Sequence, residues 1–353
     1  MFGLFSPKKD HCAQINSSAT TLEVAAGDNL LNAALGSGLP WPHNCRVGSC
    51  GTCRCKLVEG KIKPLNDFSY VLDEEQLDDG YILACQTQLR SDVTIEIDLS
   101  DSDKPAIQAE TVEGVINSVT SLTHDIVEIK VSLSQPFPEY VAGQYADLSL
   151  DGITDARSYS FAMAPCLEDD NCLSFFVRHV PNGEMSSKLH DGSRLGCRVT
   201  VSGPHGTFYL RESNAPAICI AGGSGLAPIK ALLQQHALDG FNRQIIFLFG
   251  ARSQNDLYCL DEIERIAAQN KTFSFIPVLS DEDPDSDWSG HRGLVTAFIG
   301  DQAIDLEKSE AYLCGPPPMI DSAIEVLEQR GMDKKQIYFD KFLDASHLAD
   351  GKR

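Results

Sequence analysis

Over the first hundred residues, apolar positions change between strand-like and helix-like spacing. Three stretches have the alternation or the short apolar run of a strand: 19–24, 81–89 and 93–99. Residues 27–39 repeat apolar side chains at helical spacing, with Asp28 placed to cap the start of the helix and Gly36 or Gly38 to end it. The pattern predicts a small sheet packed on one helix, followed at 101–110 by a polar linker without apolar period.

The next segment, residues 111–211, contains short alternating strands separated by Gly and Pro. The strand-like stretches are 114–120, 125–133, 145–150, 157–162 and 173–180. Because these strands recur at short spacing with turn residues between them, the segment is predicted to form an antiparallel barrel or sandwich.

From residue 212 to residue 353, fully apolar runs alternate with helical stretches. Residues 215–223 form an apolar strand that ends in glycines, and 224–238 follow as a helix with Pro228 in its first turn, where proline is tolerated. Further apolar runs are 245–251, 273–280 and 311–317. Apolar strands that alternate with helices predict a parallel sheet covered on both faces.

Length and charge fit a soluble protein of two or three domains. The 353 residues exceed one ordinary core, and no stretch has the roughly 18–20 consecutive apolar residues of a membrane-spanning helix. The opening MFGLFSPKKD places its lysines after its apolar residues, the reverse of a secretory signal, although a weak membrane-touching segment stays open. A net charge of −21 argues against a nucleic-acid partner. Disulfide-rich domains are short and secreted, whereas this chain is long and its opening is not a secretory signal, so we expect its twelve cysteines in a reducing cytoplasm.

Four of the twelve cysteines have the spacing of a metal site. Three form the pattern C-x4-C-x2-C and the fourth follows much later: Cys45, Cys50, Cys53 and Cys85. This is the spacing of plant-type ferredoxins, in which the thiolates bind the two irons of a 2Fe–2S cluster. Gly48 and Gly51 remove side chains where the backbone has to approach the sulfurs. The sequence therefore predicts a one-electron carrier in a β-grasp ferredoxin domain, residues 1–100.

Zinc is the alternative metal for four cysteine ligands. Structural zinc sites usually pair two short C-x2-4-C hairpins, whereas here a glycine-rich loop is joined by a single downstream cysteine. This arrangement favours iron and sulfide over zinc. Cys55 stands beside the loop but outside the spacing, so we expect it to be a packed side chain on the following strand.

Three short motifs in the second segment together resemble the flavin lobe of the ferredoxin–NADP reductase superfamily. They are GQY at 143–145, RSYS at 157–160 and GEMSS at 183–187. The resemblance implies an antiparallel β-barrel over residues 111–211 that binds a flavin. It also implies that the planar guanidinium of Arg157 binds the flavin pyrophosphate.

The same resemblance assigns roles to individual side chains. Tyr159 is expected against the isoalloxazine ring, and Ser160 is expected to place its hydroxyl near flavin N5, which makes it a candidate catalytic residue. Further cofactor-binding candidates are Ser158 and, in the turn that would offer N–H groups and hydroxyls to the pyrophosphate, Gly183, Met185, Ser186 and Ser187. Phe208 is a candidate for stacking near the adenine. Plain strand packing is the alternative for both aromatic residues.

Two turns that follow apolar strands point to a nicotinamide dinucleotide. The first turn contains Gly222, Gly223 and Gly225, which would let phosphate approach the start of a helix. It lacks the order G-x-G-x-x-G, so the standard Rossmann fingerprint is absent. In the reductase superfamily this turn and a second one face the dinucleotide; the second turn here is Cys314, Gly315 and Pro316. The resemblance places Cys314 beside the site of hydride transfer as the second candidate catalytic residue, with a purely structural cysteine as the alternative.

Arg252 bears on the choice between NADH and NADPH. It follows the second apolar strand of the third segment, where the adenosine ribose is usually read. A 2′-phosphate would favour several cations, yet Arg252 stands alone and Asp256 lies nearby. The sequence therefore predicts NADH, with Arg252 among the nucleotide-binding residues of a domain spanning 212–353.

With all three segments in view, the chain resembles the reductase components of bacterial multicomponent oxygenases over essentially its whole length. The matching stretches include PHNCRVGSCGTC, HDIVEI, GQYADL, AGGSGLAPIK and YLCGPPPM. Electron-transfer components of the xylene/toluene monooxygenase type are nearest, and naphthalene dioxygenase reductases come next. In these families the ferredoxin domain comes first and the flavin is FAD, whereas FMN-binding relatives carry the ferredoxin domain last.

This resemblance implies an oxidoreductase that passes electrons from NADH through FAD and a 2Fe–2S cluster to the terminal hydroxylase of an aromatic or hydrocarbon oxygenase. A membrane di-iron hydroxylase is the leading partner, which would bring the reductase transiently near a membrane, and a Rieske oxygenase is second. A reductase for a non-oxygenase partner, for example in sugar deoxygenation, and a non-enzymatic iron–sulfur protein are the alternatives.

Overall fold

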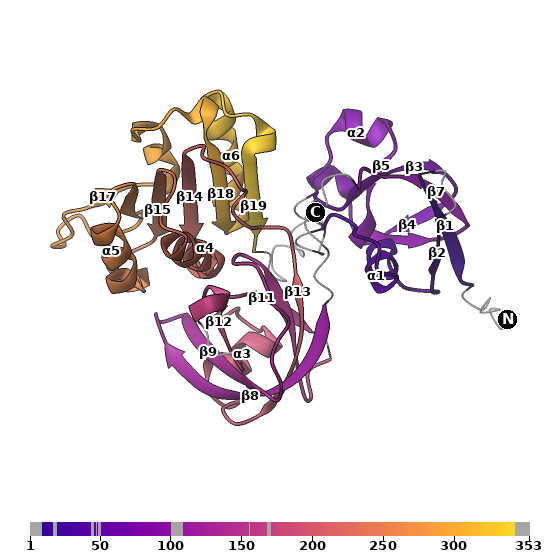
Figure 1. Cartoon of the computed structure of the whole chain (residues 1–353), viewed down its shortest axis with the longest axis horizontal. Coiled ribbons are helices and arrows are strands. Elements are labelled where there is room, and N and C mark those ends of the chain that lie inside the picture. The colour runs from indigo at the N-terminus through magenta and orange to yellow at the C-terminus, as the bar shows by residue number, and fades with distance from the viewer. Residues whose placement is uncertain are drawn as a thin grey trace. The chain divides into compact units, whose positions relative to one another are not determined.

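The computed structural model describes residues 9–16, 20–43, 46, 48, 51–99, 109–154, 156–167 and 171–342. They belong to two compact units, Met1–Gln108 and Ala109–Arg353 (Figure 1). The predicted cluster ligands Cys45 and Cys50, and residues 101–108 of the predicted linker, lie outside the described residues.

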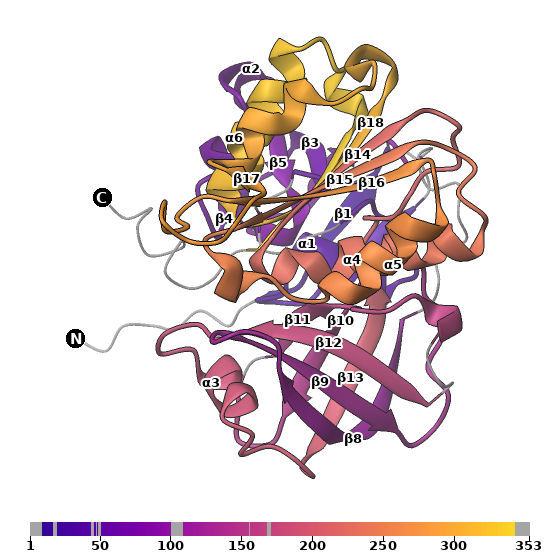
Figure 2. The ribbon, with the colours of Figure 1, turned by 90° about the vertical axis from the view of Figure 1, so that its left-hand side faces the viewer.

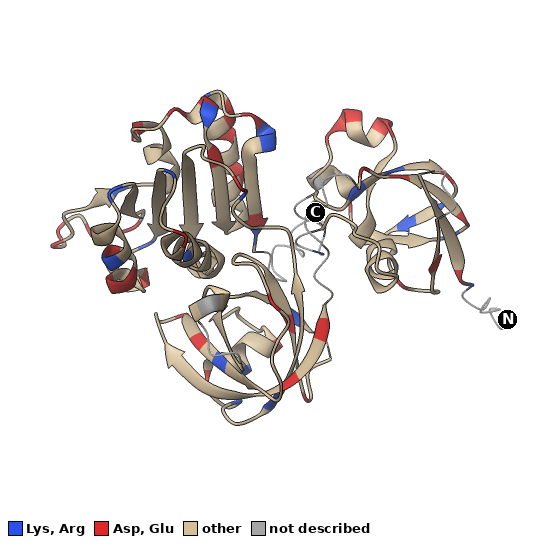
Figure 3. Ribbon diagram, viewed as in Figure 1, with Lys and Arg blue, Asp and Glu red and all other residues tan. Residues whose placement is uncertain are grey.

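The first unit contains a mixed five-stranded sheet in the order β2-β1-β7-β3-β5 and a two-stranded pair, β4-β6. Its strands are β1 His11–Ile15, β2 Thr21–Val24, β3 Arg54–Glu59, β4 Ile62–Pro64, β5 Tyr81–Leu83, β6 Thr87–Leu89 and β7 Val93–Glu96. Helix α1, Leu30–Gly36, packs on this sheet through a shared core in which Leu30 and Ile95 are fully buried. The short helix α2, Glu74–Asp78, is acidic (Figure 3). The β-grasp prediction is confirmed.

The start of α1 differs from the prediction by one residue. Its N-cap is Asn29, whose side-chain oxygen accepts the Asn32 N–H at 2.8 Å. Asp28 instead supports the cap by accepting the Asn29 N–H at 2.8 Å. Asn and Asp cap helices about equally well, so the sequence alone does not separate two such neighbours. The helix ends at Gly36, as expected.

The barrel of the second unit is a six-stranded antiparallel sheet in the order β11-β10-β13-β8-β9-β12. Its elements are β8 Glu110–Ser121, β9 Ile126–Leu133, β10 Tyr145–Leu150, β11 Arg157–Ser160, β12 Cys172–Arg178, β13 Arg198–His205 and helix α3 Glu184–His190. The two edge strands meet at a bridge between Phe161 and Phe175, which closes the sheet on itself. Both phenylalanines are fully buried, so the barrel is filled by side chains.

The remainder of this unit is a parallel sheet in the order β17-β16-β15-β14-β18-β19. Its strands are β14 Ala217–Gly222, β15 Ile245–Ala251, β16 Phe273–Leu279, β17 His291–Arg292, β18 Glu310–Gly315 and β19 Ile337–Lys341. Helices α4 Leu226–Leu238 and α5 Leu260–Gln269 cover the face toward the barrel, and α6 Pro317–Gln329 covers the other face (Figure 2). The predicted three-part fold class is confirmed. No helix among the described residues is long and apolar enough to cross a membrane.

A buried ion pair fixes the amino-terminal edge of the parallel sheet. Arg243 Nη1 lies 2.6 Å from Glu310 Oε2, and both side chains are buried. The Tyr312 hydroxyl donates to the same carboxylate oxygen at 2.7 Å. Because a buried charge without a partner is costly, each member of this pair requires the other.

Replacing Glu310 by Gln is expected to destabilise the second unit by about 3 kcal/mol, because the buried Arg243 guanidinium loses its counter-charge. Urea unfolding followed through the fluorescence of Trp288, the only tryptophan of this unit, measures the change. Glu264→Gln, at an exposed position on α5, is the control and should change stability by less than about 0.5 kcal/mol. A loss for Glu310→Gln no larger than that of the control would contradict the prediction.

Candidate functional site

Two of the four predicted cluster ligands lie in the described part of the chain, and they are adjacent. Cys53 stands just before β3 and Cys85 lies in a short turn between β5 and β6. The Cys53 sulfur accepts the backbone N–H of Cys85 at 3.5 Å, and both residues are buried. Thiolates that are far apart in sequence and adjacent in the fold suit an iron–sulfur cluster, and an N–H directed at a ligand sulfur is the kind of contact that tunes one.

The backbone around these cysteines needs its glycines. Gly48 has φ +82° and Gly51 has φ +73°, a region that favours glycine. A Cβ on Gly48 would also lie 2.6 Å from the Gln86 Cγ, beside Cys85. Cys55 is buried in β3, opposite Ile82, as expected for a packed side chain.

The RSYS strand, β11, lies against β10 of the barrel, with Ser160 opposite Tyr145. Ser160 is buried, Tyr159 is half-buried, and Arg157 and Ser158 are exposed. Burial raises the pKa of the Tyr159 phenol further above physiological pH, where a phenol is already neutral. The Ser158 hydroxyl donates to Asp147 at 2.6 Å, so it supports the strand pair. The strand thus offers an exposed guanidinium next to a partly open aromatic ring.

The GEMSS turn forms the start of α3. Its N-cap is Gly183, which has no side chain to bond to the first N–H groups of the helix. The first N–H groups of a helix have no acceptor within it, so this turn can receive an anion. The Met185 side chain is buried in the barrel core, and the Ser186 hydroxyl accepts the Val180 N–H at 3.1 Å. The Ser187 hydroxyl lies 3.2 Å from His179 Nε2. Backbone groups of the turn are therefore freer to meet a phosphate than its hydroxyls are.

The two glycine turns of the parallel sheet touch each other through their backbones. A Cβ built on Gly225 would lie 2.3 Å from the carbonyl oxygen of Cys314, and one on Gly315 would lie 2.8 Å from that of Gly222. The turns follow β14 and β18, which are neighbouring strands, and α4 begins directly after the first turn. This close approach leaves backbone, rather than side chains, at the carboxyl edge of the sheet, as dinucleotide phosphates require.

Cys314 is fully buried at the end of β18. Burial, with a smaller contribution from the Asp340 carboxylate, raises the pKa of its thiol well above the ordinary value. The thiol is therefore protonated at physiological pH and can donate a weak hydrogen bond, but it is a poor nucleophile.

Phe208 does not have the surroundings expected for an adenine-stacking residue. Its ring is 2% exposed and makes an edge contact with Tyr312, 6.2 Å between centroids, inside the core shared by barrel and parallel sheet. The packing alternative accounts for this residue, because no face of the ring is open to a ligand.

Arg252 lies in a group of charges contributed by both lobes of the second unit. Its Nη2 is 2.8 Å from Asp256 Oδ1, 3.6 Å from Asp125 Oδ2 and 3.3 Å from His124 Nε2. Ligand atoms of these three partners lie within 4.8 Å of one another, as they would around a metal ion, but the guanidinium already takes that place. Although burial acts in the opposite direction, hydrogen bonds from Ser253 and Arg252 lower the pKa of Asp256.

Asp125 also contacts Arg178, and neither residue was singled out from the sequence. Arg178 Nε donates to Asp125 Oδ2 at 3.0 Å, and its Nη1 would lie 3.8 Å from a Cβ on Gly223. Asp125 lies in the stretch HDIVEI, which is one of the stretches that match the reductase components. No local pattern, however, links it to Arg178 and Arg252, which are 53 and 127 residues away.

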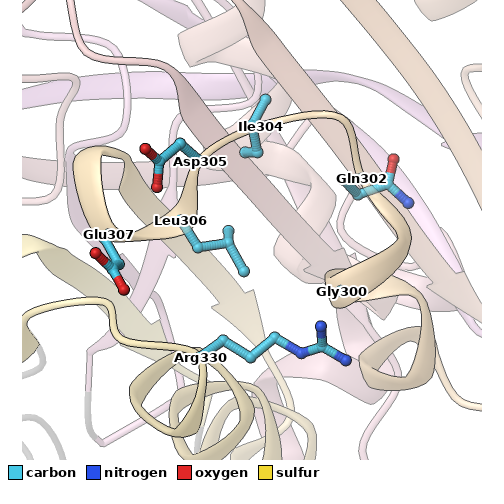
Figure 4. Close-up of a pocket in the computed structure, with 7 residues that line it drawn as sticks. All are labelled: Gly300, Gln302, Ile304, Asp305, Leu306, Glu307 and Arg330. Carbon is cyan, nitrogen blue, oxygen red and sulfur yellow. The ribbon is translucent and has the colours of Figure 1, made fainter.

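A separate hollow lies at the other end of the parallel sheet. Figure 4 shows its lining residues, Gly300, Gln302, Ile304, Asp305, Leu306, Glu307 and Arg330. They precede β18 or follow α6, whereas both glycine turns follow the carboxyl ends of strands. The hollow is therefore not part of the glycine-turn site.

Three family matches follow one another along the chain. Residues 13–90 match the 2Fe-2S iron-sulfur cluster binding domain, 113–209 the oxidoreductase FAD-binding domain, and 219–325 the oxidoreductase NAD-binding domain. The xylene/toluene monooxygenase electron transfer component XylA of Pseudomonas putida is 40% identical, with 96% of each chain covered. The phenol 2-monooxygenase reductase component DmpP of Pseudomonas sp. (strain CF600) is 34% identical, with 96% of this chain and 95% of that one covered.

Solved structures match over a similar length. The Amycolatopsis cytochrome P450 reductase GcoB has a TM-score of 0.81 at 29% identity, and the ferredoxin reductase in carbazole 1,9a-dioxygenase has 0.74 at 26%. Each match covers 95% of this chain and 99% of the other.

Replacing Gly225 by Ala is expected to weaken NAD⁺ binding at least about tenfold, a loss of about 1.4 kcal/mol, because the added methyl group forces the two glycine turns apart. Isothermal titration of the FAD-loaded protein with NAD⁺ measures the dissociation constant. Gly36→Ala, where a Cβ meets nothing within 4 Å, is the control and should bind normally. Unchanged NAD⁺ affinity in Gly225→Ala would contradict the role of this contact.

Proposed function

Because the chain belongs to the reductase components of multicomponent oxygenases, we propose that it takes electrons from NADH and delivers them singly to a membrane-bound di-iron hydroxylase. The observation that carries the proposal is the full-length likeness to an electron transfer component of xylene/toluene monooxygenase. That the chain is an oxidoreductase with 2Fe–2S, FAD and NAD domains, and that its family serves oxygenases, follows from the family itself.

The residue assignments below are part of the proposal. When bound, FAD accepts a hydride from reduced nicotinamide and the 2Fe–2S cluster carries electrons one at a time. The cluster ligands are Cys45, Cys50, Cys53 and Cys85, and the contact between the last two supports this set. The division into residues 1–100, 101–110, 111–211 and 212–353 is retained, and the spans of the three family matches support it.

The barrel residues hold and orient the flavin. The exposed Arg157 guanidinium and the N–H groups at the start of α3 bind its pyrophosphate, while the half-buried Tyr159 ring packs against its ring system. The buried Ser160 hydroxyl would be the hydrogen-bond donor to N5 of a bound flavin. The remaining residues of the two motifs shape the strand and the turn: Ser158, Gly183, Met185, Ser186 and Ser187.

The nucleotide lies across the two glycine turns. Gly222, Gly223 and Gly225 would allow its phosphates to approach backbone N–H groups, and Gly315 and Pro316 of the second turn would face it from the neighbouring strand. The protonated Cys314 thiol borders the nicotinamide and excludes water there without competing as a nucleophile.

The charges around Arg252 support NADH as the donor. Two carboxylates, Asp256 and Asp125, already pair with this guanidinium, so it is poorly placed to receive a 2′-phosphate. The neighbouring loop adds Glu282, which accepts the Gln254 N–H at 2.7 Å. A dianionic 2′-phosphate would meet net negative charge here, whereas a 2′-hydroxyl can donate to a carboxylate.

The value of kcat/KM for NADH should exceed that for NADPH by at least about tenfold, or about 1.4 kcal/mol in transition-state binding, with ferricyanide as acceptor. Asp256→Asn, which removes one of the two carboxylates from Arg252, should narrow the ratio by weakening the repulsion of the 2′-phosphate. Glu264→Gln is the control and should leave the ratio unchanged. Equal use of NADPH by the unaltered protein would contradict NADH as the donor.

The di-iron hydroxylase is the finer part of the proposal. It is favoured because the relatives named above belong to monooxygenases of xylene/toluene and phenol. Other relatives are named for toluate and naphthalene dioxygenases, which keeps a Rieske oxygenase as the second candidate. A membrane-bound partner of this kind would bring the reductase transiently near a membrane.

Mixing the reductase with membranes that contain a di-iron hydrocarbon hydroxylase should support NADH-dependent product formation, whereas mixing it with a purified Rieske dioxygenase should not. Cys85→Ser should lose this turnover and cytochrome c reduction but retain ferricyanide reduction, because only electron transfer beyond the flavin needs the cluster ligands. Cys55→Ser, on the adjoining strand, is the matched control and should retain all three. Turnover only with the Rieske enzyme would overturn the choice of partner.

A further inference from the structure

Lys230 is a buried cation that no part of the proposed mechanism uses. It lies on α4, one turn after the glycine turn of β14, and only 4% of it is exposed. Its Nζ donates to the carbonyl oxygen of Ala162 at 3.0 Å and lies 3.3 Å from Glu262 Oε2. The Phe176 ring of β12 lies 5.9 Å from the same ammonium. The cation thus bonds to its own lobe through Glu262 and to the barrel through Ala162.

Gln234 makes a second bond of the same kind one helical turn later. Its side-chain oxygen accepts the Ala164 N–H at 2.9 Å, and its amide nitrogen donates to Glu262 Oε1. Lys230 and Gln234 lie at i and i+4 on α4, so both reach from the same face of the helix. Figure 2 shows this helix between the parallel sheet and the barrel strands.

The two backbone groups that receive these bonds belong to the segment after the RSYS strand. Ala162 is two residues beyond Ser160, and Ala164 is four residues beyond it. At its other end, α4 begins directly after Gly225. One rigid helix therefore joins the turn assigned to the nucleotide to the strand assigned to the flavin.

Packing alone does not explain a lysine at this position. An ammonium is costly to bury, and an unbranched apolar side chain of similar length would fill the same space without that cost. A direct bond to a backbone carbonyl, unlike an apolar contact, fixes distance and direction. The buried Arg243 guanidinium differs from Lys230, because both of its partners, the Glu310 carboxylate and the Ala215 carbonyl, lie outside the barrel.

We propose that Lys230 and Gln234 are positioning residues that fix the distance between the nicotinamide turn and the flavin strand. They touch neither ligand and act through α4 on one side and through residues 162–164 on the other. The inference rests on the proposed function, because it presumes that NADH reduces the flavin held by the barrel. The effect expected of their loss is on the rate of hydride transfer and not on nucleotide affinity, since short donor–acceptor distances govern the transfer step.

The test is Lys230→Met in the full-length protein loaded with both cofactors. Three quantities are measured: the anaerobic rate of flavin reduction by NADH, the dissociation constant of NAD⁺, and hydrogen exchange of the segment 161–167. We expect the rate to fall at least about tenfold while the dissociation constant changes less than about threefold. We expect exchange in 161–167 to increase, because the loop loses a partner. Lys230→Arg, which keeps the charge and the donor, should recover most of the rate.

Two further variants keep the test decisive. Glu310→Gln also breaks a buried charge pair of this lobe but leaves the barrel contact intact, so it should lose stability and keep the rate and the exchange of 161–167. Gln234→Met, which removes the second bond and retains the lysine, should lower the rate less than Lys230→Met does. Because Gln234 accepts the Ala164 N–H, this variant should raise the exchange of that amide directly. It stands in for Lys230→Met if that protein does not fold. An unchanged rate in both Lys230→Met and Gln234→Met, or an equal loss in Glu310→Gln, would overturn the inference. If the unaltered protein shows no flavin reduction by NADH, the proposed function fails instead.

Discussion

The contact between the two glycine turns is the constraint on which the nucleotide site depends. Because the backbone of Gly225 packs against the backbone of Cys314, a side chain at position 225 would have no room. The same contact sets where α4 begins, because the helix follows the first turn directly, and where the Cys314 thiol lies, because Cys314 stands at the start of the second turn. A single close approach at the edge of a parallel sheet thereby decides the position of the proposed phosphate site, a helix and a buried thiol.

The polar groups of the second unit divide into those that stabilise one lobe and those that join two. Arg243 and Glu310 belong to the first kind, because their bonds close within the parallel-sheet lobe and its leading segment. Lys230 and Arg252 belong to the second, since each contacts the parallel-sheet lobe and the barrel. A protein that passes electrons between two bound cofactors needs polar groups that join its two lobes. The stability of each lobe alone does not require such groups.

Sequence reasoning predicted the parts of this molecule that depend on local pattern. The cysteine spacing, the RSYS strand, the glycine turns and the three kinds of sheet all follow from short motifs or from apolar period. It did not predict contacts that join residues far apart, such as Lys230 with Ala162 or Asp125 with Arg252, because no local rule relates them. The two interpretations of Phe208 stayed open for a related reason: an aromatic residue after a turn looks the same in the sequence whether it meets a ligand or, as the structure shows, Tyr312.

Two of the polar links between barrel and parallel sheet, at Arg252 and at Lys230, differ in their surroundings, and this difference has a physical consequence. The Arg252 guanidinium is half exposed, 54%, so its attraction to Asp125 is weakened by dissolved ions, whereas the Lys230 ammonium is shielded from solvent. Raising the ionic strength therefore weakens the contact between Arg252 and Asp125 and leaves the bond between Lys230 and Ala162 intact. The Lys230 bond and the apolar core that the two lobes share would still hold barrel and sheet together when the Arg252 contacts weaken.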